Sequence, residues 1–474
     1  MTGRVDLSLD DVEFHPLSFF DESGRVFRHE GELFRVLGAE RERFFLRVLE
    51  DGLVDRLVRE RLLIDTELAD FTVDGRAVLR HRTLPLVSYP FEWCAEMLRD
   101  AALATLALQR ELERHGVMLQ DAHPMNVVFD GSTPLWVDAG SLVPSSGPGV
   151  WPAREEFVAC FLNPLRLMAL GHGRIARWLL HDVAGIDAAE LEAFLAPSLA
   201  RSFAREGRRA ARTLRARIPR SARPALRAVR QALVDAGGRR LPGISAAGST
   251  TQSLEDDIRR LDLSVAPGPW TGYYDSFPSL TDPAEWDDKQ RSVDTALRRV
   301  APRTVLDIGS NRGWYSLLAA QHGCDVAAID TDARSVELLY RDARSRSLPV
   351  QALVADFRHL SLGYGPGFSR ILPAPRRLQA DLVLALALSH HLVFWSRFDF
   401  RQIVMGLSAF ATKGLLVEFV PSDDQYVSMW NPETRPWYTL ELLEEELRRE
   451  FSHVEVLPSH PEPRVLLLCL RDGM

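Results

Sequence analysis

Lysine is nearly absent from this chain of 474 residues: Lys289 and Lys413 are its only lysines, and the rest of its 57 basic residues are arginine. Cysteine is scarce as well. The four cysteines lie far apart, so neither a disulfide framework nor a cysteine metal site is expected. No apolar run reaches the roughly 18 to 20 residues of a membrane-spanning helix, and the acidic N-terminus lacks a signal-peptide core. These absences predict a cytoplasmic protein without a membrane partner.

Charge is distributed unevenly along the chain, whose composition of 46% hydrophobic and 26% charged residues is that of a globular protein. Residues 201–240 contain thirteen arginines and two acidic residues, so the rest of the chain carries a net charge of −19 within the total of −8. Acidic domains around one basic helical segment are not typical of a general nucleic-acid binder, and no nucleic-acid partner is expected. A non-enzymatic alternative is that residues 201–240 bind RNA or a membrane surface, although Phe203, the one aromatic residue there, offers little base stacking.

Strand and helix patterns alternate along the C-terminal half. Short apolar runs at 303–309, 325–330, 350–357, 381–388 and 414–420 are separated by helical patterns that include 314–323, 333–347 and 398–411. This alternation predicts an α/β domain with a parallel, doubly wound sheet. A helix at 441–451 then precedes strands at 453–458 and 463–470, which the short turn between them makes antiparallel to each other.

The chain divides into three parts by composition. Residues 1–150 mix short strand-like runs with a helix at 91–116, and residues 151–245 form a helical, arginine-rich connector that runs into a linker rich in Gly, Ser and Thr. Residues 246–474 hold the alternating α/β pattern. We therefore predict two structured domains joined by a helical connector.

A glycine-rich turn follows the first strand of the C-terminal domain. Asp307, Gly309, Asn311 and Gly313 form the pattern D-x-G-x-N-x-G, in which the glycines let the backbone approach a ligand. Asp330 ends the next strand, 21 residues after Gly309, where a carboxylate can accept both hydroxyls of a ribose. The pattern therefore predicts a nucleotide-type cofactor at this edge of the sheet.

Two classes of cofactor could use this turn, and two residues separate them. A dinucleotide site needs a small residue where this chain has Trp314, and the Asp307 carboxylate would repel a pyrophosphate. Asp307 suits instead a ligand that carries an ammonium group. Together with the antiparallel last pair of strands, the motif resembles that of the class I S-adenosylmethionine-dependent methyltransferases, whose Rossmann-like sheet has a reversed last strand.

This resemblance implies roles for further residues. Gly309, Asn311 and Gly313 would line the methionine part of the cofactor with Asp307 nearby, and Asp330 would bind the ribose. The other implied contacts are Asp356 and Phe357 at the adenine, Leu388 with Ser389 and His390 after the fourth strand, and Tyr273 with Trp270 and Tyr274 as a cap over the cofactor. Aromatic core packing is the alternative for the last three.

A histidine pair, His390-His391, is predicted at the end of the fourth strand, at the edge where ligands bind in open α/β sheets. Because successive side chains of a strand point in opposite directions, one of the two imidazoles should face the site. A neutral imidazole with a pKa of about 6.5 can act as the base for an acceptor hydroxyl or amine. Glu418, at the end of the fifth strand, could orient the base or the acceptor, and packing is the alternative for all three residues.

A second motif lies in the first domain. Asp121 and Asn126 are five residues apart, and Asp138-Ala139-Gly140 begins twelve residues after Asn126. Protein kinases and small-molecule phosphotransferases carry D-x-x-x-x-N followed by D-F-G, in which the first Asp accepts the hydroxyl proton while the Asn and the second Asp hold Mg²⁺. The resemblance implies an α+β kinase-like domain with a candidate Mg²⁺–ATP site at Asp121, Asn126 and Asp138, and no other metal ligand is assigned.

This kinase-like domain lacks the usual phosphate-binding lysine. No lysine precedes Lys289, so Arg35 is the only substitute on a suitable strand, and an arginine is not an equivalent donor. Leu119-Gln120 stand where kinases have His-Arg. We therefore expect a scaffold or a substrate-binding unit, with a bifunctional Mg²⁺–ATP phosphotransferase and methyltransferase as the alternative.

The two motifs together resemble, over nearly the whole chain, a bacterial group of class I methyltransferases described as nodulation-protein-like. The stretches that carry the resemblance include LQDAHPMNVVFDGSTPLWVDAGS, FLNPLRLMAL, LDIGSNRGWYS, ALALSHHL and LVEFVPSDD. The resemblance implies an S-adenosylmethionine-dependent methyltransferase of secondary metabolism. Its acceptor would be the oxygen or nitrogen of a small molecule or a glycan-type metabolite.

Overall fold

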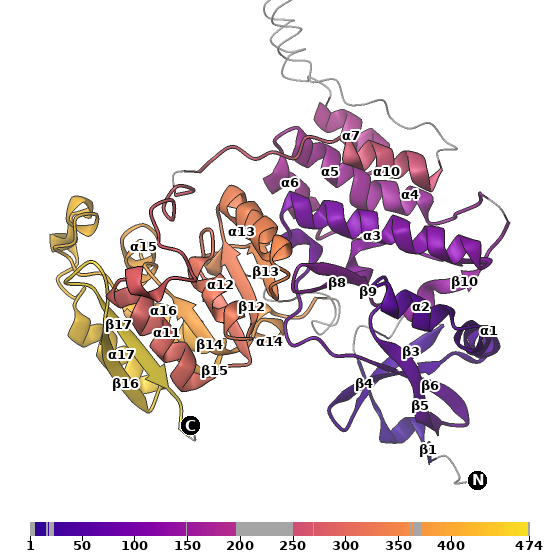
Figure 1. Cartoon of the computed structure of the whole chain (residues 1–474), viewed down its shortest axis with the longest axis horizontal. Helices are drawn as coiled ribbons and strands as arrows, with labels where there is room; N and C mark the ends of the chain where they lie inside the picture. The colour runs from indigo at the N-terminus through magenta and orange to yellow at the C-terminus, as the bar shows by residue number, and fades with distance from the viewer. Residues whose placement is uncertain are drawn as a thin grey trace, which may run out of the picture.

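The computed structural model describes residues 5–15, 18, 23–147, 149–195, 250–268, 270–360, 363 and 371–472 (Figure 1). These residues form two bodies that lie side by side: an N-terminal one with a layer of helices above its sheet, and a C-terminal one built around a single large sheet (Figure 1). The arginine-rich stretch at 201–240 lies outside the described residues. Its assignment as an RNA-binding or membrane-binding arm therefore stays a prediction.

The N-terminal body begins with a six-stranded sheet in the order β1-β5-β6-β4-β3-β2. Its strands are β1 (Asp6–Leu7), β2 (Glu13–Phe14), β3 (Gly24–His29), β4 (Glu32–Leu37), β5 (Thr66–Val73) and β6 (Arg76–His81), with helices α1 (Ala39–Glu50) and α2 (Leu53–Arg59) between β4 and β5 in the chain. β3 and β4 pair through the two-residue turn Glu30-Gly31, whose φ angles of 49° and 83° are those that such a hairpin turn requires.

A long helix and two small antiparallel pairs complete the core of this body. Helix α3 (Ala95–Arg114) begins later than the sequence pattern predicts, because Pro90–Glu92 forms a separate 3-10 turn before it. β7 (Val117–Leu119) pairs with β10 (Leu142–Pro144), and β8 (Val127–Asp130) pairs with β9 (Thr133–Trp136). The β8–β9 hairpin is the strand–turn–strand that the kinase resemblance implies.

Short helices complete the helical layer around α3, and of these α5 and α10 contact α3 directly. They are α4 (Arg154–Phe157), α5 (Asn163–Ala169), α6 (Gly173–Leu179), α7 (Ala188–Leu195) and α10 (Thr251–Arg259), and a π-helical turn (Val158–Leu162) joins α4 to α5. Helix α10 lies against α3, where Glu255 forms an ion pair with Arg110 and Leu254 and Ile258 are buried. The chain thus contacts the N-terminal body once more before it enters the C-terminal sheet. Within the described ranges, none of the helices has the length and apolarity to cross a membrane.

The C-terminal sheet has seven strands in the order β13-β12-β11-β14-β15-β17-β16. They are β11 (Thr304–Ile308), β12 (Asp325–Asp330), β13 (Val350–Val354), β14 (Ala380–Ala385), β15 (Ala411–Phe419), β16 (His453–Pro458) and β17 (Val465–Leu470). The five strands from β11 to β15 are parallel, and β17 runs antiparallel to both β15 and β16. Each strand overlaps one of the strands predicted from the sequence, and the predicted reversal of the last strand is confirmed.

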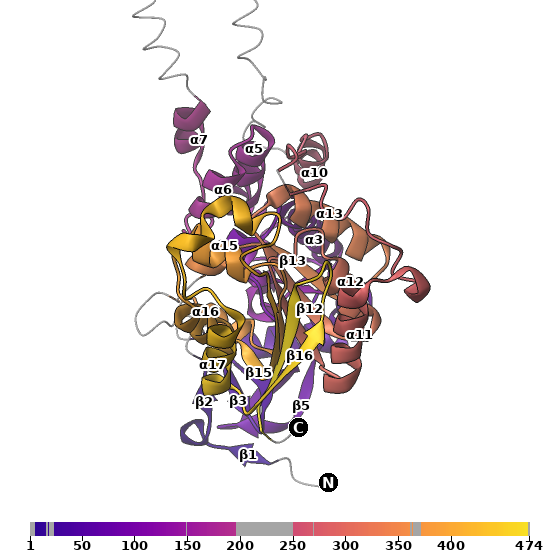
Figure 2. The ribbon, with the colours of Figure 1, turned by 90° about the vertical axis from the view of Figure 1, so that its left-hand side faces the viewer.

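Helices cover both faces of this sheet (Figure 2). The helices in this half are α11 (Asp288–Val300), α12 (Trp314–Gln321), α13 (Ala333–Ser345), α14 (Ala374–Arg377), α15 (Ser389–Phe394), α16 (Phe400–Ser408) and α17 (Leu440–Glu450). Figure 2 shows α11 and α12 on one face and α16 and α17 on the other. Because both faces are covered, the central strands β14 and β15 read as continuous apolar runs rather than as alternating ones.

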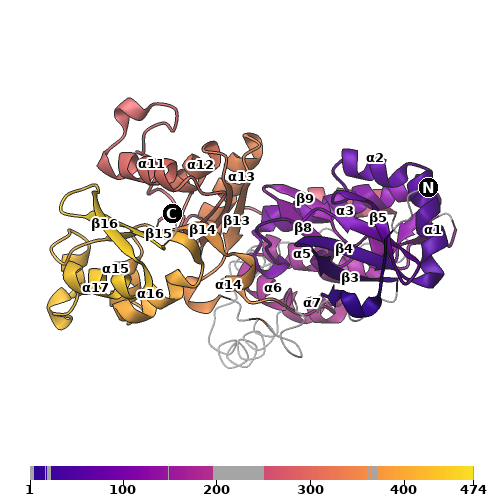
Figure 3. The ribbon, with the colours of Figure 1, turned by 90° about the horizontal axis from the view of Figure 1, so that it is seen from below.

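The two bodies meet along strand β13, the edge of the C-terminal sheet (Figure 3). Trp93 of the N-terminal body forms an antiparallel bridge with Leu353 of that edge strand. Beside the bridge, the Arg377 guanidinium of α14 forms an ion pair with the Glu92 carboxylate, and the two side chains are only 2% and 4% exposed. The Tyr340 hydroxyl of α13 donates to Asp100 of α3 over 2.7 Å. The N-terminal body therefore covers a sheet edge that would otherwise be open.

Candidate functional site

The glycine-rich turn joins β11 to α12 as predicted. Gly309, Asn311 and Gly313 all adopt positive φ angles, of 82°, 51° and 70°. A side chain at Gly313 would place its Cβ 2.5 Å from both methyl carbons of Leu339, so the close packing of α13 on this turn also requires glycine. The turn lies at the carboxyl end of β11, the edge at which open α/β sheets bind their ligands.

Asp330 closes the turn from the neighbouring strand. Its two carboxylate oxygens accept hydrogen bonds from the backbone N–H groups of Asn311 and Asp332, each over 2.8 Å. Burial raises the pKa of Asp330. The Asn311 side chain donates in turn to the backbone carbonyl of Trp270, 2.8 Å away, which ties the segment around residue 270 to the turn. On that segment Tyr273 is 37% exposed, and its ring packs 5.1 Å from that of Tyr274.

Asp307 lies at the base of the turn and is 3% exposed. It accepts a hydrogen bond of 2.6 Å from the Ser316 hydroxyl. Burial, together with the charge of Asp330, raises the pKa of Asp307 to about 7 in spite of that hydrogen bond. In the described part of the chain, neither Asp307 nor Asp330 forms an ion pair. Two carboxylates that have no ion-pair partner among the described residues, at one sheet edge, favour a ligand that carries positive charge.

The residues expected at the adenine lie beyond the end of β13. The Asp356 carboxylate accepts from the Arg358 guanidinium over 2.6 Å, and Phe357 packs against α16, where a Cβ at Gly406 would come within 2.9 Å of its ring. Leu388 packs over the glycine-rich turn, 3.5 Å from the position of a Cβ at Gly309. The structure thus brings Leu388 to the turn and gives Asp356 an internal cation.

The predicted geometry of the histidine pair is wrong. Strand β14 ends at Ala385, and His390 and His391 lie in the first turn of helix α15 rather than at the end of a strand. The chain leaves the strand at Ala387, whose φ is 49°. Alternation along a strand therefore does not separate the two rings, whose centroids are 4.3 Å apart in one aromatic cluster.

Both imidazoles are neutral at pH 7 in this environment. Burial lowers the pKa of His391 to about 4, and burial together with the neighbouring His391 lowers the pKa of His390 well below its ordinary value. His390 is 4% exposed, and its Nδ1 atom has no hydrogen-bond partner among the described residues. An unprotonated, unpartnered ring nitrogen can accept a proton or a hydrogen bond.

Glu418 does not face an open site. It is buried on β15, where its Oε2 accepts from the Lys289 ammonium over 2.7 Å and from the Ala387 backbone N–H over 2.8 Å. Its Oε1 accepts from the Ser459 hydroxyl over 2.8 Å. These contacts fix the backbone three residues before His390. Lys289 is not among the residues predicted for this site from the sequence. The feature that could have pointed to it is that Lys289 is one of only two lysines in the chain.

The structure brings together the three residues predicted for Mg²⁺–ATP and gives each of them a protein partner. The Asp138 carboxylate accepts from the Arg35 guanidinium of β4, 2.8 Å away, and from the Gly140 N–H. The Asn126 side chain donates to Asp121 over 2.7 Å, while its backbone carbonyl accepts from Val137 across the β8–β9 hairpin. Arg35 therefore occupies the place in the sheet where sequence reasoning expected a substitute for the kinase lysine, and it contacts Asp138 directly.

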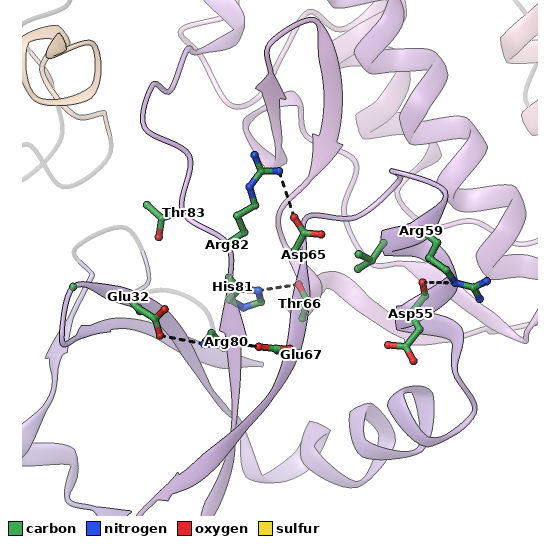
Figure 4. A pocket seen from close by; sticks show the side chains of 12 residues that line it. Glu32, Asp55, Arg59, Asp65, Thr66, Glu67, Arg80, His81, Arg82 and Thr83 are labelled. Atoms are coloured by element: carbon green, nitrogen blue, oxygen red, sulfur yellow. Dashed lines mark hydrogen bonds and ion pairs between the residues drawn. The ribbon is translucent and has the colours of Figure 1, made fainter. Parts of the chain in front are cut away.

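A pocket of about 790 Å³ lies elsewhere in the N-terminal body, at the ends of β5 and β6 (Figure 4). Two of its three arginines are paired with acidic residues: Arg80 with Glu67 and Glu32, and Arg82 with Asp65 and Asp130. The third, Arg59, donates to the backbone carbonyl of Asp55. Asp121, Asn126 and Asp138 do not line it. It is therefore separate from the predicted nucleotide site, and its paired charges do not favour one class of ligand.

The sheet order, the reversed strand β17 and the glycine-rich turn at the end of β11 agree with the class I methyltransferase fold that the sequence resembles. No protein-family model matches the chain. The chain is similar to the nodulation protein NoeA of Rhizobium meliloti (strain 1021), with 29% identity over 421 residues that cover 86% of this chain and 85% of NoeA. This similarity confirms the predicted resemblance to nodulation-protein-like sequences.

Among solved structures, the chain is similar to WbdD, bound there to the kinase inhibitor LY294002, with 19% identity, coverage of 39% of this chain and 41% of WbdD, and a TM-score of 0.30. It is also similar to the magnesium protoporphyrin IX methyltransferase ChlM of Synechocystis PCC 6803, described with bound SAM. That match has 16% identity, covers 39% of this chain and 79% of ChlM, and has a TM-score of 0.28. Superpositions this loose carry no inference about the chemistry of this chain.

Proposed function

We propose that the protein transfers a methyl group from S-adenosylmethionine to an oxygen or nitrogen atom of a small-molecule or glycan-type acceptor. The observation that carries the proposal is the pair of carboxylates beside Gly309, the buried Asp307 and the half-buried Asp330, which have no ion-pair partner in the described part of the chain. A ligand with an ammonium group would supply the missing positive charge.

Each residue of the turn has a place in this proposal. The Asp330 oxygens keep lone pairs that can accept from ribose hydroxyls, and the glycines of the turn let the backbone approach the ligand. When bound, the cofactor supplies an electrophilic methyl group, so the protein has to hold the acceptor in line and exclude water. The neutral imidazoles of His390 and His391 can take up the proton that an acceptor hydroxyl or amine loses.

The N-terminal body serves in this proposal as a scaffold for the methyltransferase part. Two contacts support that role: the Arg35 guanidinium lies on Asp138, and the Glu92–Arg377 pair fixes the N-terminal body to the edge of the C-terminal sheet. A bifunctional enzyme would need Asp138 to release Arg35 and bind a metal ion instead.

Calorimetric titration of the full chain with S-adenosylmethionine tests the proposal. The Asp330→Ala variant should bind the cofactor less tightly by about 1–3 kcal/mol, the usual loss for hydrogen bonds to a charged group. Asp288→Ala is the matched control, since Asp288 lies on the exposed side of α11 in a surface pair with Arg291. Tight binding of NAD with no response to S-adenosylmethionine would overturn the proposal.

A further inference from the structure

Four rings from three separate segments meet next to the proposed cofactor site. The His391 ring lies 5.6 Å from Trp270, 4.7 Å from Trp395 and 5.1 Å from Trp430, and the last two rings are 5.0 Å apart. Trp270 belongs to the segment that is tied to Asn311, His391 and Trp395 to α15 and its C-terminal end, and Trp430 to the 3-10 turn Val427–Trp430. We call Trp270, His391, Trp395 and Trp430 the aromatic wall.

The aromatic wall is not ordinary core. Trp395 is 57% exposed and Trp270 is 37% exposed, and Met429 beside Trp430 is 68% exposed. Most of the large side chains of the C-terminal sheet are buried, so an exposed group of tryptophans at the ligand-binding edge indicates a surface that a ligand covers. The rings of Trp270 and Trp395 meet the His391 ring edge-on, and the ring of Trp430 meets it at a tilt.

A second observation points to the same place. His390, which is buried and stacks on Trp430 at 5.6 Å, leaves its Nδ1 without a partner among the described residues. Buried polar atoms are normally paired, so this nitrogen calls for a donor such as a hydroxyl. The buried acidic side chains Glu418 and Asp424 are already paired, with Lys289 and Arg464 respectively. The wall therefore offers flat apolar faces and a hydrogen-bond acceptor, and the buried carboxylates Glu418 and Asp424 are not free to bind an ammonium group.

We propose that the aromatic wall binds the methyl acceptor, and that this acceptor is an uncharged hydroxyl compound with an apolar ring face, a sugar or a phenol, rather than an amine. The inference rests on the proposed function and narrows its acceptor. The hydroxyl oxygen forms the new bond to the methyl carbon as the carbon–sulfur bond breaks, and its proton passes to the imidazole of His390 or His391. S-adenosylhomocysteine is the second product.

The experiment uses the full chain saturated with S-adenosylhomocysteine and three probes: cellotriose, 4-methylcatechol and benzylamine. We expect cellotriose, which is a sugar, or 4-methylcatechol, which is a phenol, to bind in calorimetry. The probe that binds shows whether the acceptor is a sugar or a phenol. Benzylamine should bind at least about tenfold more weakly, because its ammonium group loses hydration at the wall and the buried carboxylates Glu418 and Asp424 are already paired. Trp395→Ala and Trp430→Ala should each weaken the neutral probe about tenfold or more, the loss expected for one aromatic surface, and Trp395→Phe should restore most of it.

Trp178→Ala is the control for these variants, because Trp178 is 72% exposed on α6 in the N-terminal body. Unchanged affinity for S-adenosylhomocysteine shows that the variants keep the cofactor site. The inference is overturned if benzylamine binds as tightly as the neutral probes, if the tryptophan variants bind like the parent protein, or if neither neutral probe binds to the saturated protein. Failure of S-adenosylhomocysteine itself to bind would overturn the proposed function, and this inference with it.

Discussion

Both motif regions of this chain contain aspartate carboxylates, and the two regions differ in whether a cation is paired with them. In the C-terminal sheet, Asp307 and Asp330 lie together, and neither has an ion-pair partner among the described residues. In the N-terminal body, Asp138 is paired with Arg35, and Asp121 accepts from Asn126. Burial raises the pKa of both unpaired carboxylates, which favours a positively charged ligand, whereas an arginine on a carboxylate takes the place that a metal ion would need.

The comparison shows what a motif can and cannot indicate. The spacing D-x-x-x-x-N…D-A-G correctly predicts the hairpin that brings Asn126 and Asp138 together. Whether those oxygens are available to a metal depends on a residue 103 positions away, Arg35. We therefore expect the C-terminal site to respond to its ligand and the N-terminal site not to, and the following experiments break or sharpen that contrast.

The largest effect should come from the histidine pair. If one of the two is the base, His390→Ala or His391→Ala should lower the rate of methyl transfer to the neutral acceptor by about 10²–10⁴-fold and leave cofactor affinity unchanged. His453→Ala, on the exposed edge strand β16, is the control. Activity at the parent level in both variants would make the two rings packing residues only.

The contact between the two regions should give the next largest effect. Replacing Glu92 by Gln leaves the Arg377 guanidinium buried without its charge partner, so the free energy of unfolding should fall by about 3–5 kcal/mol in denaturant titrations. The Glu445→Gln control, which breaks a surface pair with Arg449, should cost about 1 kcal/mol or less. Equal effects of the two variants would contradict a scaffold role for this contact.

Cofactor affinity should depend on pH through Asp307. Its pKa of about 7 means that the carboxylate gains its charge as the pH rises through neutrality, so S-adenosylmethionine should bind up to about tenfold more tightly at pH 8 than at pH 6. In the ligand-free protein the sign is reversed: the raised pKa lowers stability as the pH rises from about 4 to about 7. Asp307→Asn should remove the Asp307 contribution to both dependences, which calorimetry and thermal unfolding can follow.

The smallest effect is expected at the N-terminal motif. With Arg35 on Asp138, Mg²⁺–ATP should bind weakly or not at all, and Asp138→Asn should leave methyl transfer close to the parent level. Labelled ATP and the full chain provide the assay. Phosphoryl transfer that disappears in Asp138→Asn would establish the bifunctional alternative in place of the scaffold.

Local patterns were sufficient to predict most of the C-terminal fold. The strands from β11 to β15 follow apolar runs, and the glycines of the turn adopt the positive φ angles for which that residue is suited. Local patterns failed at His390 and His391, because the start of helix α15 depends on the Ala387 N–H and its distant acceptor Glu418. The partner of Glu418, Lys289, lies 129 residues away in the chain, and a local sequence pattern cannot predict a contact over that separation.

The contrast between the two regions can be tested in one calorimetric measurement, in which the same preparation of the full chain is titrated with S-adenosylmethionine and then with Mg²⁺–ATP. The account predicts that S-adenosylmethionine binds at one site, that Asp330→Ala weakens this binding, and that Mg²⁺–ATP gives no saturable heat. Saturable binding of Mg²⁺–ATP to a protein that does not respond to S-adenosylmethionine would contradict it.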